Sequence, residues 1–293
     1  MKFTLILTAV ALLLLASSSA SVHCYNPCGF IYNSGSFDTF SYPGARTTVP
    51  EGISDNGQIV GYYDAHGTHG FSYRWGGSFT TIDRPRNFQT LLLGVNNNGD
   101  IVGYSTSGSF LHSGDSFTAI DYPGALPLST VAWGINANGD IAGFYHSNST
   151  THGFLDFAGV FSSLNYPGAL ATLPRGINDN RTIVGYYLAG SLAQSHSYGF
   201  IESGGLFTSV NYPGASGTAL VGINDQGQAV GSSTTCSFFV FDGVTFTCIA
   251  YRGHYLSVSG INDSGQIVGY YLDYAVPELP SFLLFGSALL GNV

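Results

Sequence analysis

The stretch that decides the fold is GISDNGQIVGYY at residues 52–63, because GINDSGQIVGYY returns at 260–271. Four more divergent copies lie between these two. The glycines that open the copies are Gly52, Gly94, Gly134, Gly176, Gly222 and Gly260. Their successive spacings are 42, 40, 42, 46 and 38 residues. A repeat of this period indicates one supersecondary unit built several times over.

A second phrase alternates with the first and is written most fully as GFIYNSGSFDTFSYPGA at 29–45. Its later phenylalanine always stands five residues before a Tyr or an Arg. Those phenylalanines are Phe37, Phe79, Phe117, Phe161, Phe207 and Phe246. The residues that follow them are Tyr42, Arg84, Tyr122, Tyr166, Tyr212 and Tyr251. Such constant spacing predicts a fixed backbone geometry in each unit.

Each unit is expected to contain four short strands, a to d. Strand a leads into the glycine phrase, strand b is the apolar run at 59–63, strand c follows Gly-Phe, and strand d covers 79–83 in the first full unit. Asn or Asp followed by Gly between a and b predicts a tight hairpin. Four antiparallel strands in roughly 42 residues are typical of a β-propeller blade.

The two ends of the chain carry complementary half-units. The N-terminal half-unit supplies strands c and d, and the C-terminal one supplies a and b. Joined, they complete a sixth blade and close the ring without a free edge. An open β-solenoid is the rival fold, but it would need capping units at its ends. We therefore predict an all-β, six-bladed propeller with four antiparallel strands per blade.

The N-terminal segment MKFTLILTAVALLLLASSSA (1–20) has a basic start, an apolar stretch and a small-residue end. These features predict a secretory signal peptide, with cleavage after Ala20. We divide the rest of the chain into a cysteine-containing lead-in (21–28), the propeller (29–274) and an apolar tail (275–293). The predicted location is secreted, extracellular or at the cell surface.

The formal charge is −9, and the only lysine is Lys2. Phosphate contacts require Lys and Arg, so the composition argues against a nucleic-acid partner. The acidity is better explained as a contribution to solubility.

Four cysteines in an exported chain allow two disulfides in three connectivities. Cys236 and Cys248 flank an apolar segment symmetrically, and a turn at Asp242-Gly243 would bring them face to face across a hairpin. Cys24 and Cys28 are close enough in sequence for a local bridge. We favour these two pairs, and free thiols are the alternative. Neither pair has the spacing of a metal site with matching histidines.

The phrases GINDNG, IVGYY, HGF and FTTIDYPGA, in their local variants, resemble the HAF-repeat family of bacterial extracellular proteins. The resemblance covers about residues 29–271. It implies export, and it implies no established catalytic activity.

The tail VPELPSFLLFGSALLGNV resembles a PEP-CTERM sorting segment, which implies processing by an exosortase. It departs from that pattern in two ways, because Leu279 interrupts Pro-Glu-Pro and no basic cluster follows. The apolar run from Phe282 to Leu290 is too short to span a bilayer. A transient membrane contact through this tail is the expectation.

Variation in length is concentrated between strands b and c. From the phrase glycine to the phenylalanine of strand c, the distances are 19, 16, 20, 24 and 17 residues. Variable loops on a constant scaffold are where binding usually resides. The expected loops are 64–69, 146–152 and 188–198. They hold His66, His69, His146, His152 and His196.

Imidazoles gathered on one rim could bind a transition metal. The repeat itself explains His69 and His152 as strand-start residues, however, and no acidic partners are evident. Turns such as NNNGD (96–100) resemble calcium loops only weakly, and a hairpin turn explains them better. We therefore predict no metal and no cofactor.

Tyrosines of the d–a loops are expected to lie on the same rim as these histidines. They are Tyr42, Tyr122, Tyr166, Tyr212 and Tyr251. Aromatic faces beside hydroxyl and amide groups suit sugar binding. The alternative is that each Tyr-Pro packs one blade on the next, and five recurrences of one residue favour that alternative.

For catalysis, a hydrolase needs carboxylates or histidines outside the repeat. The candidates are Glu51, Asp115, Asp156, Glu202 and Asp273, and the sequence shows no convergence among them. We therefore predict a secreted, non-catalytic monomer that binds extracellular polysaccharide or a surface protein through the b–c and d–a rim. A polysaccharide-acting enzyme and a structural matrix protein are the alternatives.

Overall fold

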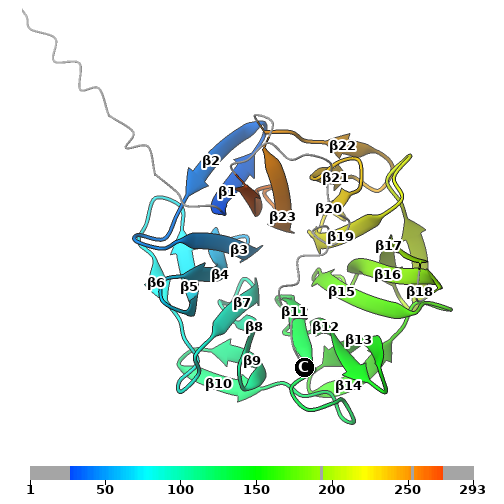
Figure 1. Ribbon diagram of the computed structural model, residues 1–293, viewed down its shortest axis with the longest axis horizontal. Coiled ribbons are helices and arrows are strands. Elements are labelled where there is room, and N and C mark those ends of the chain that lie inside the picture. The colour runs from blue at the N-terminus through cyan, green and yellow to red at the C-terminus, as the bar shows by residue number, and fades with distance from the viewer. Residues whose placement is uncertain (1–26, 192–193, 252–253, 273–293) are drawn as a thin grey trace, which may run out of the picture.

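The computed structural model describes residues 27–191, 194–251 and 254–272, and within them every regular element is a β-strand. The predicted signal peptide, the position of Cys24 and the apolar tail lie outside the described residues. Viewed down the shortest axis, the sheets are arranged around a central axis as in a β-propeller (Figure 1). The all-β, propeller-like prediction is confirmed.

Hydrogen bonding groups the strands into four sheets of four strands and one of eight. The first complete sheet is β3 (Thr47–Ile53), β4 (Gln58–Asp64), β5 (Thr68–Arg74) and β6 (Thr80–Thr81). The next is β7 (Thr90–Val95), β8 (Ile101–Ser105), β9 (Gly108–Ser113) and β10 (Ser116–Ala119). A third is β19 (Thr218–Ile223), β20 (Ala229–Ser233), β21 (Phe239–Phe241) and β22 (Phe246–Cys248).

The eight-stranded sheet consists of two meanders. One is β11 (Val131–Ile135), β12 (Ile141–Ser147), β13 (Thr150–Phe157) and β14 (Val160–Leu164). The other is β15 (Ala171–Ile177), β16 (Ile183–Ser191), β17 (Gln194–Ser203) and β18 (Leu206–Val210). A parallel pair between Thr151 and Ala171 joins them. Hydrogen bonding thus joins two of the expected four-stranded units into one sheet, because strands from neighbouring meanders come within pairing distance.

The ends of the chain meet in one sheet, in the order β2-β1-β24-β23. Its strands are β1 (Cys28–Asn33), β2 (Ser36–Phe40), β23 (Tyr255–Ile261) and β24 (Ile267–Leu272). β1 pairs antiparallel with β24, from Cys28 opposite Tyr271 to Tyr32 opposite Ile267. The N-terminal strands thus complete the C-terminal half-unit, as the repeat count predicted.

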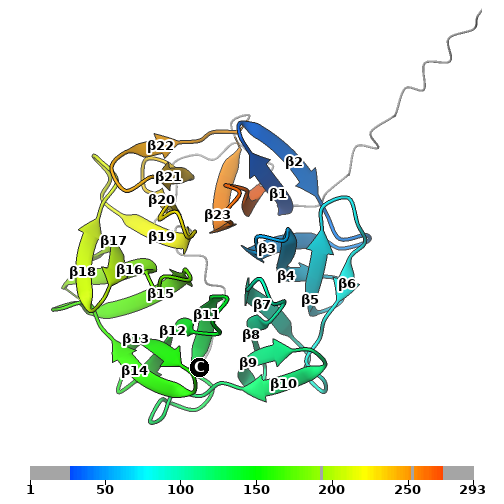
Figure 2. The same ribbon diagram turned by 180° about the vertical axis from the view of Figure 1, so that it is seen from behind.

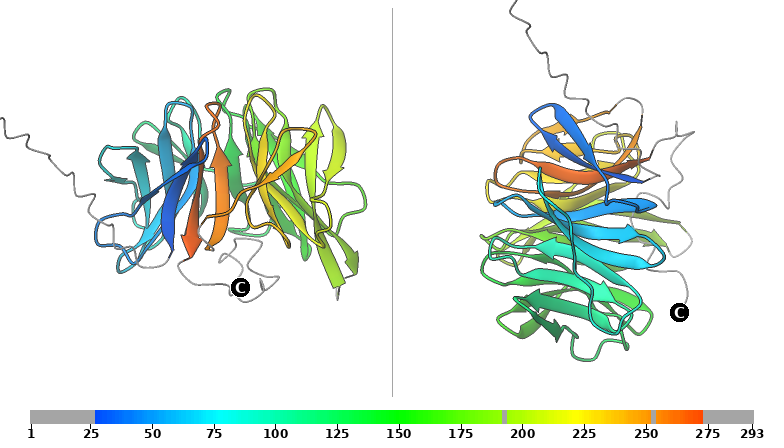
Figure 3. Two further views of the ribbon diagram at one scale, coloured as in Figure 1. Left: turned by 90° about the horizontal axis from the view of Figure 1, so that it is seen from above. Right: turned by 90° about the vertical axis from the view of Figure 1, so that its left-hand side faces the viewer.

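The strands that contain the phrase glycines are innermost, and they are β3, β7, β11, β15, β19 and β23 (Figure 1). Seen from behind, β2, β6, β10, β14, β18 and β22 form the outer edge (Figure 2). We call the end of the ring with the a–b and c–d turns the turn rim. The opposite end, with the b–c and d–a connections, is the loop rim. The yellow-green β16–β17 hairpin extends beyond the loop rim (Figure 3).

The core lies between the sheets, where one phenylalanine of each unit is completely buried. These residues are Phe30, Phe71, Phe110, Phe154, Phe200 and Phe239. Each buried phenylalanine contributes about 2–3 kcal/mol of hydrophobic free energy. The repeat of Gly-Phe in the sequence is therefore a repeat of core contacts, and it explains why the unit recurs at constant internal spacing.

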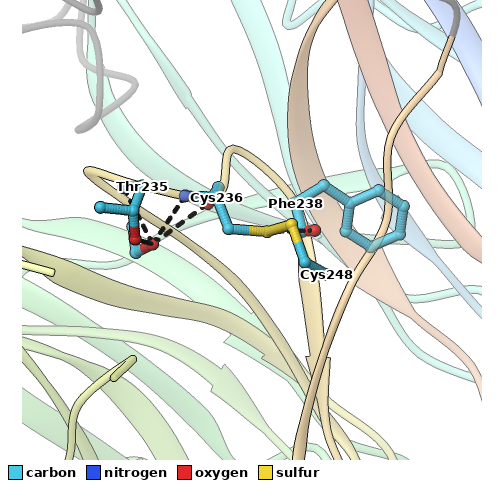
Figure 4. The surroundings of a disulfide bond; sticks show 5 residues. Thr235, Cys236, Phe238 and Cys248 are labelled. Carbon is cyan, nitrogen blue, oxygen red and sulfur yellow. Dashed lines mark hydrogen bonds between the residues drawn. A yellow bond between two sulfur atoms is a disulfide. The ribbon is translucent and has the colours of Figure 1, made fainter. Parts of the chain in front are cut away.

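The disulfide between Cys236 and Cys248 is present, as predicted (Figure 4). The two residues are not cross-strand partners, however, since Cys248 pairs with Phe239. Cys236 lies in the β20–β21 connection, where its amide donates to the Ser233 hydroxyl at 3.0 Å. The bridge therefore ties this connection to the outer strand. It indicates an oxidising compartment. The predicted Cys24–Cys28 pair lies outside the described residues because Cys24 does.

Candidate functional site

The six phrase glycines form a closed ring at the centre of the molecule. An ideal Cβ on Gly52 would lie 3.2 Å from Gly94 Cα, and one on Gly176 would lie 3.0 Å from Gly222 Cα. On Gly260 it would lie 3.5 Å from Gly52 Cα, which closes the ring. The innermost strands approach so closely that a side chain at this position has little room. We call this ring of glycines the waist.

Immediately before each phrase glycine, the pairing between the innermost strand and its neighbour skips one residue. In β3 the register shifts between Pro50 and Gly52, and in β15 it shifts between Pro174 and Gly176. The skipped residues are Glu51, Leu93, Trp133, Arg175, Val221 and Ser259. We call them the bulge residues, because one extra residue in a strand pair is a β-bulge.

All six bulge residues line a hollow of about 80 Å³ at the waist. Arg175 is only 5% exposed, and its guanidinium carbon lies 3.6 Å from the centre of the Trp133 ring. Burial raises the pKa of Glu51 to about 8, while the positive charge of Arg175 opposes that rise. Burial, followed by the nearby Glu51 charge, also raises the pKa of Tyr62. The hollow is therefore a weakly solvated site that combines a cation, a carboxyl group and an indole ring.

Above the waist, at the turn rim, asparagines link one unit to the next. Asn96 Nδ2 donates to the Asn136 carbonyl at 3.0 Å, and Asn136 does the same to Asn178. The series continues through Asn224 and Asn262 to the Ser54 carbonyl. Within each turn the same side chain caps the hairpin. The Asn/Asp-Gly phrases are thus structural turns, as predicted.

A second series of bonds surrounds the turn-rim mouth of the channel. Asp179, Asp225 and Asp263 each accept a hydrogen bond from the backbone amide of the preceding unit. Asp55 accepts one from Asp263 at 2.7 Å. Burial raises the pKa of Asp225, and the charges of neighbouring aspartates add to that effect. This mouth is consequently acidic. Among the described residues, no three His, Cys, Asp or Glu side chains are placed to hold a metal ion.

At the loop rim, the predicted tyrosines are half-buried and pack against other rings. Tyr42 stacks on Tyr63 at a centroid distance of 3.6 Å, and Tyr63 stacks on His69 at 5.3 Å. The same three-ring stack recurs as Tyr122, Tyr145 and His152, and as Tyr166, Tyr187 and Tyr198. We call these the aromatic stacks. Each joins a d–a loop to strands b and c of the unit that follows it.

The other two predicted tyrosines are placed differently. Tyr212 packs at a tilt on Phe239, because Ser233 stands where the units with an aromatic stack have the central tyrosine. Tyr251 contacts Phe37 at 4.5 Å and Tyr271 edge-on at 5.9 Å. In the remaining unit Arg84 replaces the tyrosine, and it donates to the Ser105 hydroxyl at 3.2 Å.

The histidines do not form one cluster. His69 Nδ1 lies 2.7 Å from Asp83, His146 contacts Thr151, and His152 contacts Asn165. His66 and His196 are exposed. His69 and His152 lie near the starts of β5 and β13, as the repeat indicated, whereas the expectation that His146 and His196 lie in loops was wrong. The antiparallel ladders continue to Asp64–Thr68, Ser147–Thr150 and Ser191–Gln194, so these segments are strand hairpins.

The carboxylates outside the repeat do not assemble into a catalytic pair among the described residues. Asp156 and Glu202 each accept a bond from a glycine amide in their own c–d turn. Asp115 is exposed, and Asp273 lies outside the described residues. Glu51 alone among them lines the channel. Sequence reasoning missed the bulge residues as a set. The available signal was that the residue before each phrase glycine differs in all six copies.

No family model matches the chain, and no curated protein matches it. Among solved structures, it resembles a protein assigned as TolB from Agrobacterium tumefaciens, with 12% identity over 85% of this chain and 99% of that one, at a TM-score of 0.61. Virginiamycin B lyase from Staphylococcus aureus shares 12% identity over 77% and 95% of the two chains, with a TM-score of 0.44. YCF48 from Cyanidioschyzon merolae shares 9% identity over 81% and 85%, with a TM-score of 0.46.

The similarity to TolB places this chain in the class of β-propeller-like proteins, and at 12% identity it establishes the fold alone. Within the described residues, the structure contains no helix of the length and hydropathy needed to cross a membrane.

Proposed function

We propose that this protein is an exported, non-catalytic, six-bladed propeller that binds extracellular glycan through its loop rim. The count of six treats each half of the eight-stranded sheet as a blade, since the inter-meander link is a single parallel pair. The HAF-like phrases and the N-terminal segment support export, and the disulfide is consistent with it. The tail would add PEP-CTERM-like sorting.

The observation that carries the glycan proposal is the set of aromatic stacks. They place partly exposed rings, histidine nitrogens and amide groups together at one rim. Asn165, for example, lies beside His152, and Asp83 lies beside His69. A pyranose offers C–H faces and hydroxyl groups together, so a ring edge flanked by polar groups suits it. Three such stacks on separate units would provide several weak contacts to one polymer, which raises its avidity.

A glycan array with the purified chain tests this function. We expect binding to extended polysaccharides, and we expect Tyr166→Ala and Tyr122→Ala to weaken it at least about tenfold. Tyr32→Ala is the matched control, because Tyr32 is also partly buried among rings but lies near the turn rim. Failure of the unchanged chain to bind any glycan, or equal loss in the Tyr32 variant, would contradict the proposal.

A protein partner at the same rim is the second candidate. Phe88 is 88% exposed in the β6–β7 connection, and Leu126 and Leu128 are about half exposed in the β10–β11 connection. Exposed apolar side chains on adjacent connections are typical of protein-binding surfaces. Phe88→Ser should weaken the binding of a protein partner without affecting glycan binding. A pull-down that compares the purified unchanged chain with the Phe88→Ser variant would measure the loss.

A further inference from the structure

The bulge residues form a second site, separate from the loop rim. Four of the six phrase glycines are followed by Ile-Asn, yet the residue before the glycine is acidic, basic, aromatic, aliphatic or hydroxylic according to the unit. The bulge turns that residue toward the central hollow in every unit. A constant backbone that presents different chemistry at one shared point is typical of a binding site.

Arg175 is the cation of this hollow. Trp133, Tyr186 and Phe144 surround its guanidinium at 3.6, 5.4 and 5.8 Å from the ring centres. Its Nη2 donates to the Tyr186 hydroxyl at 3.1 Å, whereas its buried Nε has no hydrogen-bond partner. Among the described residues, no carboxylate forms an ion pair with it. A buried, unpaired guanidinium donor is costly, so the site is suited to an anion that supplies the acceptor.

Glu51 belongs to β3 and Arg175 to β15, two strands that face each other across the axis (Figure 1). Since burial raises the pKa of Glu51 to about 8, its carboxyl group holds a proton near neutral pH and can donate a hydrogen bond. Leu93 and Val221 provide apolar walls, and Ser259 adds a hydroxyl group. The hollow thus offers a guanidinium donor, a carboxyl donor and an apolar lining.

We propose that the waist binds a compact monocarboxylate, with one carboxylate oxygen on the Arg175 guanidinium and the other on the Glu51 carboxyl group. The single arginine and the acidic turn-rim mouth, formed by Asp55, Asp179, Asp225 and Asp263, disfavour dianions such as phosphate. The hollow of about 80 Å³ limits the ligand to a small acid. This site is independent of glycan binding at the loop rim.

Trp133 gives the site its own reporter. The chain contains two tryptophans, and the other, Trp75, is about half exposed at the end of β5. In Trp75→Phe, the remaining fluorescence comes from Trp133. Sodium acetate is titrated at constant ionic strength, with acetamide as the neutral probe of the same shape. We expect a saturable change in emission with acetate and none with acetamide.

Three variants in the Trp75→Phe background test whether acetate binds at Arg175. Arg175→Gln should abolish the saturable acetate response, and Arg74→Gln, a surface arginine, should leave it unchanged. Val221→Phe fills the hollow while retaining Arg175, so it should also abolish the response even if Arg175→Gln fails to fold. An equal response to acetate and acetamide would overturn the proposal. So would an unchanged acetate response in folded Arg175→Gln or Val221→Phe.

Discussion

Two adjacent positions on the same six strands behave in opposite ways. The phrase glycine is identical in all six units, whereas the bulge residue before it differs in all six. The glycines lie against one another's backbone around the axis, and at every one except Gly260 a Cβ would come closer to a neighbouring strand than an ordinary contact allows. The bulge residues face the hollow, where their side chains differ in size and chemistry from unit to unit.

The difference shows that, in this repeat protein, constant residues pack the units together while variable residues line the central hollow. Contacts between units repeat because every unit meets the next in the same way, through a glycine, a buried phenylalanine and a turn asparagine. The axis is the one place where all units meet together, so a side chain there interacts with several different partners. Variation at the bulge is therefore the simplest way to give a symmetric ring an asymmetric site.

The largest loss of stability is expected from opening the ring that holds the phrase glycines and the bulge residues. Deletion of 29–40 removes β1 and β2 from the closing sheet, and deletion of 260–271 removes β24 and the end of β23, so each exposes a new sheet edge. Either truncation should abolish cooperative unfolding of the whole domain, measured by thermal denaturation with circular dichroism. A folded truncated monomer of near-native stability would show that closure is dispensable.

Substitution within the waist is expected to have the next largest effect, and to differ between glycines. A Cβ on Gly94 would collide with the Trp133 carbonyl, whereas on Gly260 its nearest atoms lie at an ordinary 3.5 Å. Gly94→Ala should lower the free energy of unfolding by about 3 kcal/mol through overpacking. Gly260→Ala should change it by less than about 1 kcal/mol. If urea denaturation showed equal losses of unfolding free energy in the two variants, close packing at the waist would not be the reason that glycine is required there.

At the bulge, the contribution of Glu51 to the free energy of unfolding should depend on pH. The pKa of Glu51 rises from 4.5 to about 8 in the folded chain, so the folded chain holds more protons than the unfolded chain between these values. The stability of the chain should therefore fall by about 4 kcal/mol as the pH rises from 4.5 to 8. Glu51→Gln should remove this part of the slope, and Asp115→Asn, at an exposed carboxylate, should retain it. Urea denaturation at several pH values measures both.

The smallest loss of stability is expected from substitutions at the turn rim. Asn136 is buried, donates to Asn178 and Asp140, and links two units, whereas Asn138 is exposed and donates to Asp179. Asn136→Ala should cost about 1–2 kcal/mol, because it leaves a buried carbonyl group without a donor. Asn138→Ala should cost less than about 0.5 kcal/mol. Similar melting temperatures for the two variants would contradict a structural role for the asparagine series.

The architecture was predictable because it follows from the number and order of the repeated phrases. The regular alternation of the glycine phrase with the phenylalanine phrase specifies strand order, and unmatched half-units at the two ends specify which strands pair. The exact register was less accessible. Cys248 faces Phe239 and not Cys236, because the turn of the β21–β22 hairpin is centred between Asp242 and Thr245, beyond the midpoint between the two cysteines. Strand β6 is also shorter than the predicted 79–83.

The candidate sites were predictable only in part. The rim tyrosines could be named from their repeated spacing, but their stacking on Tyr63, Tyr145 and Tyr187 depends on how a loop meets the following unit. The histidine segments were expected to be loops because their lengths vary. In the structure, extra length extends the strands of the hairpin, since each added pair of residues can form another ladder hydrogen bond.

By itself, the sequence determined the repeating unit, its internal strand order and the pairing of the two ends, since each follows from local propensity and constant spacing. Only the tertiary structure decided what the residues before the glycines do. A bulge reverses the face that a strand residue presents, and closure of the ring brings Glu51, Trp133 and Arg175 around one hollow. Burial, pKa and cation–π contact arise from that convergence, which no single unit contains.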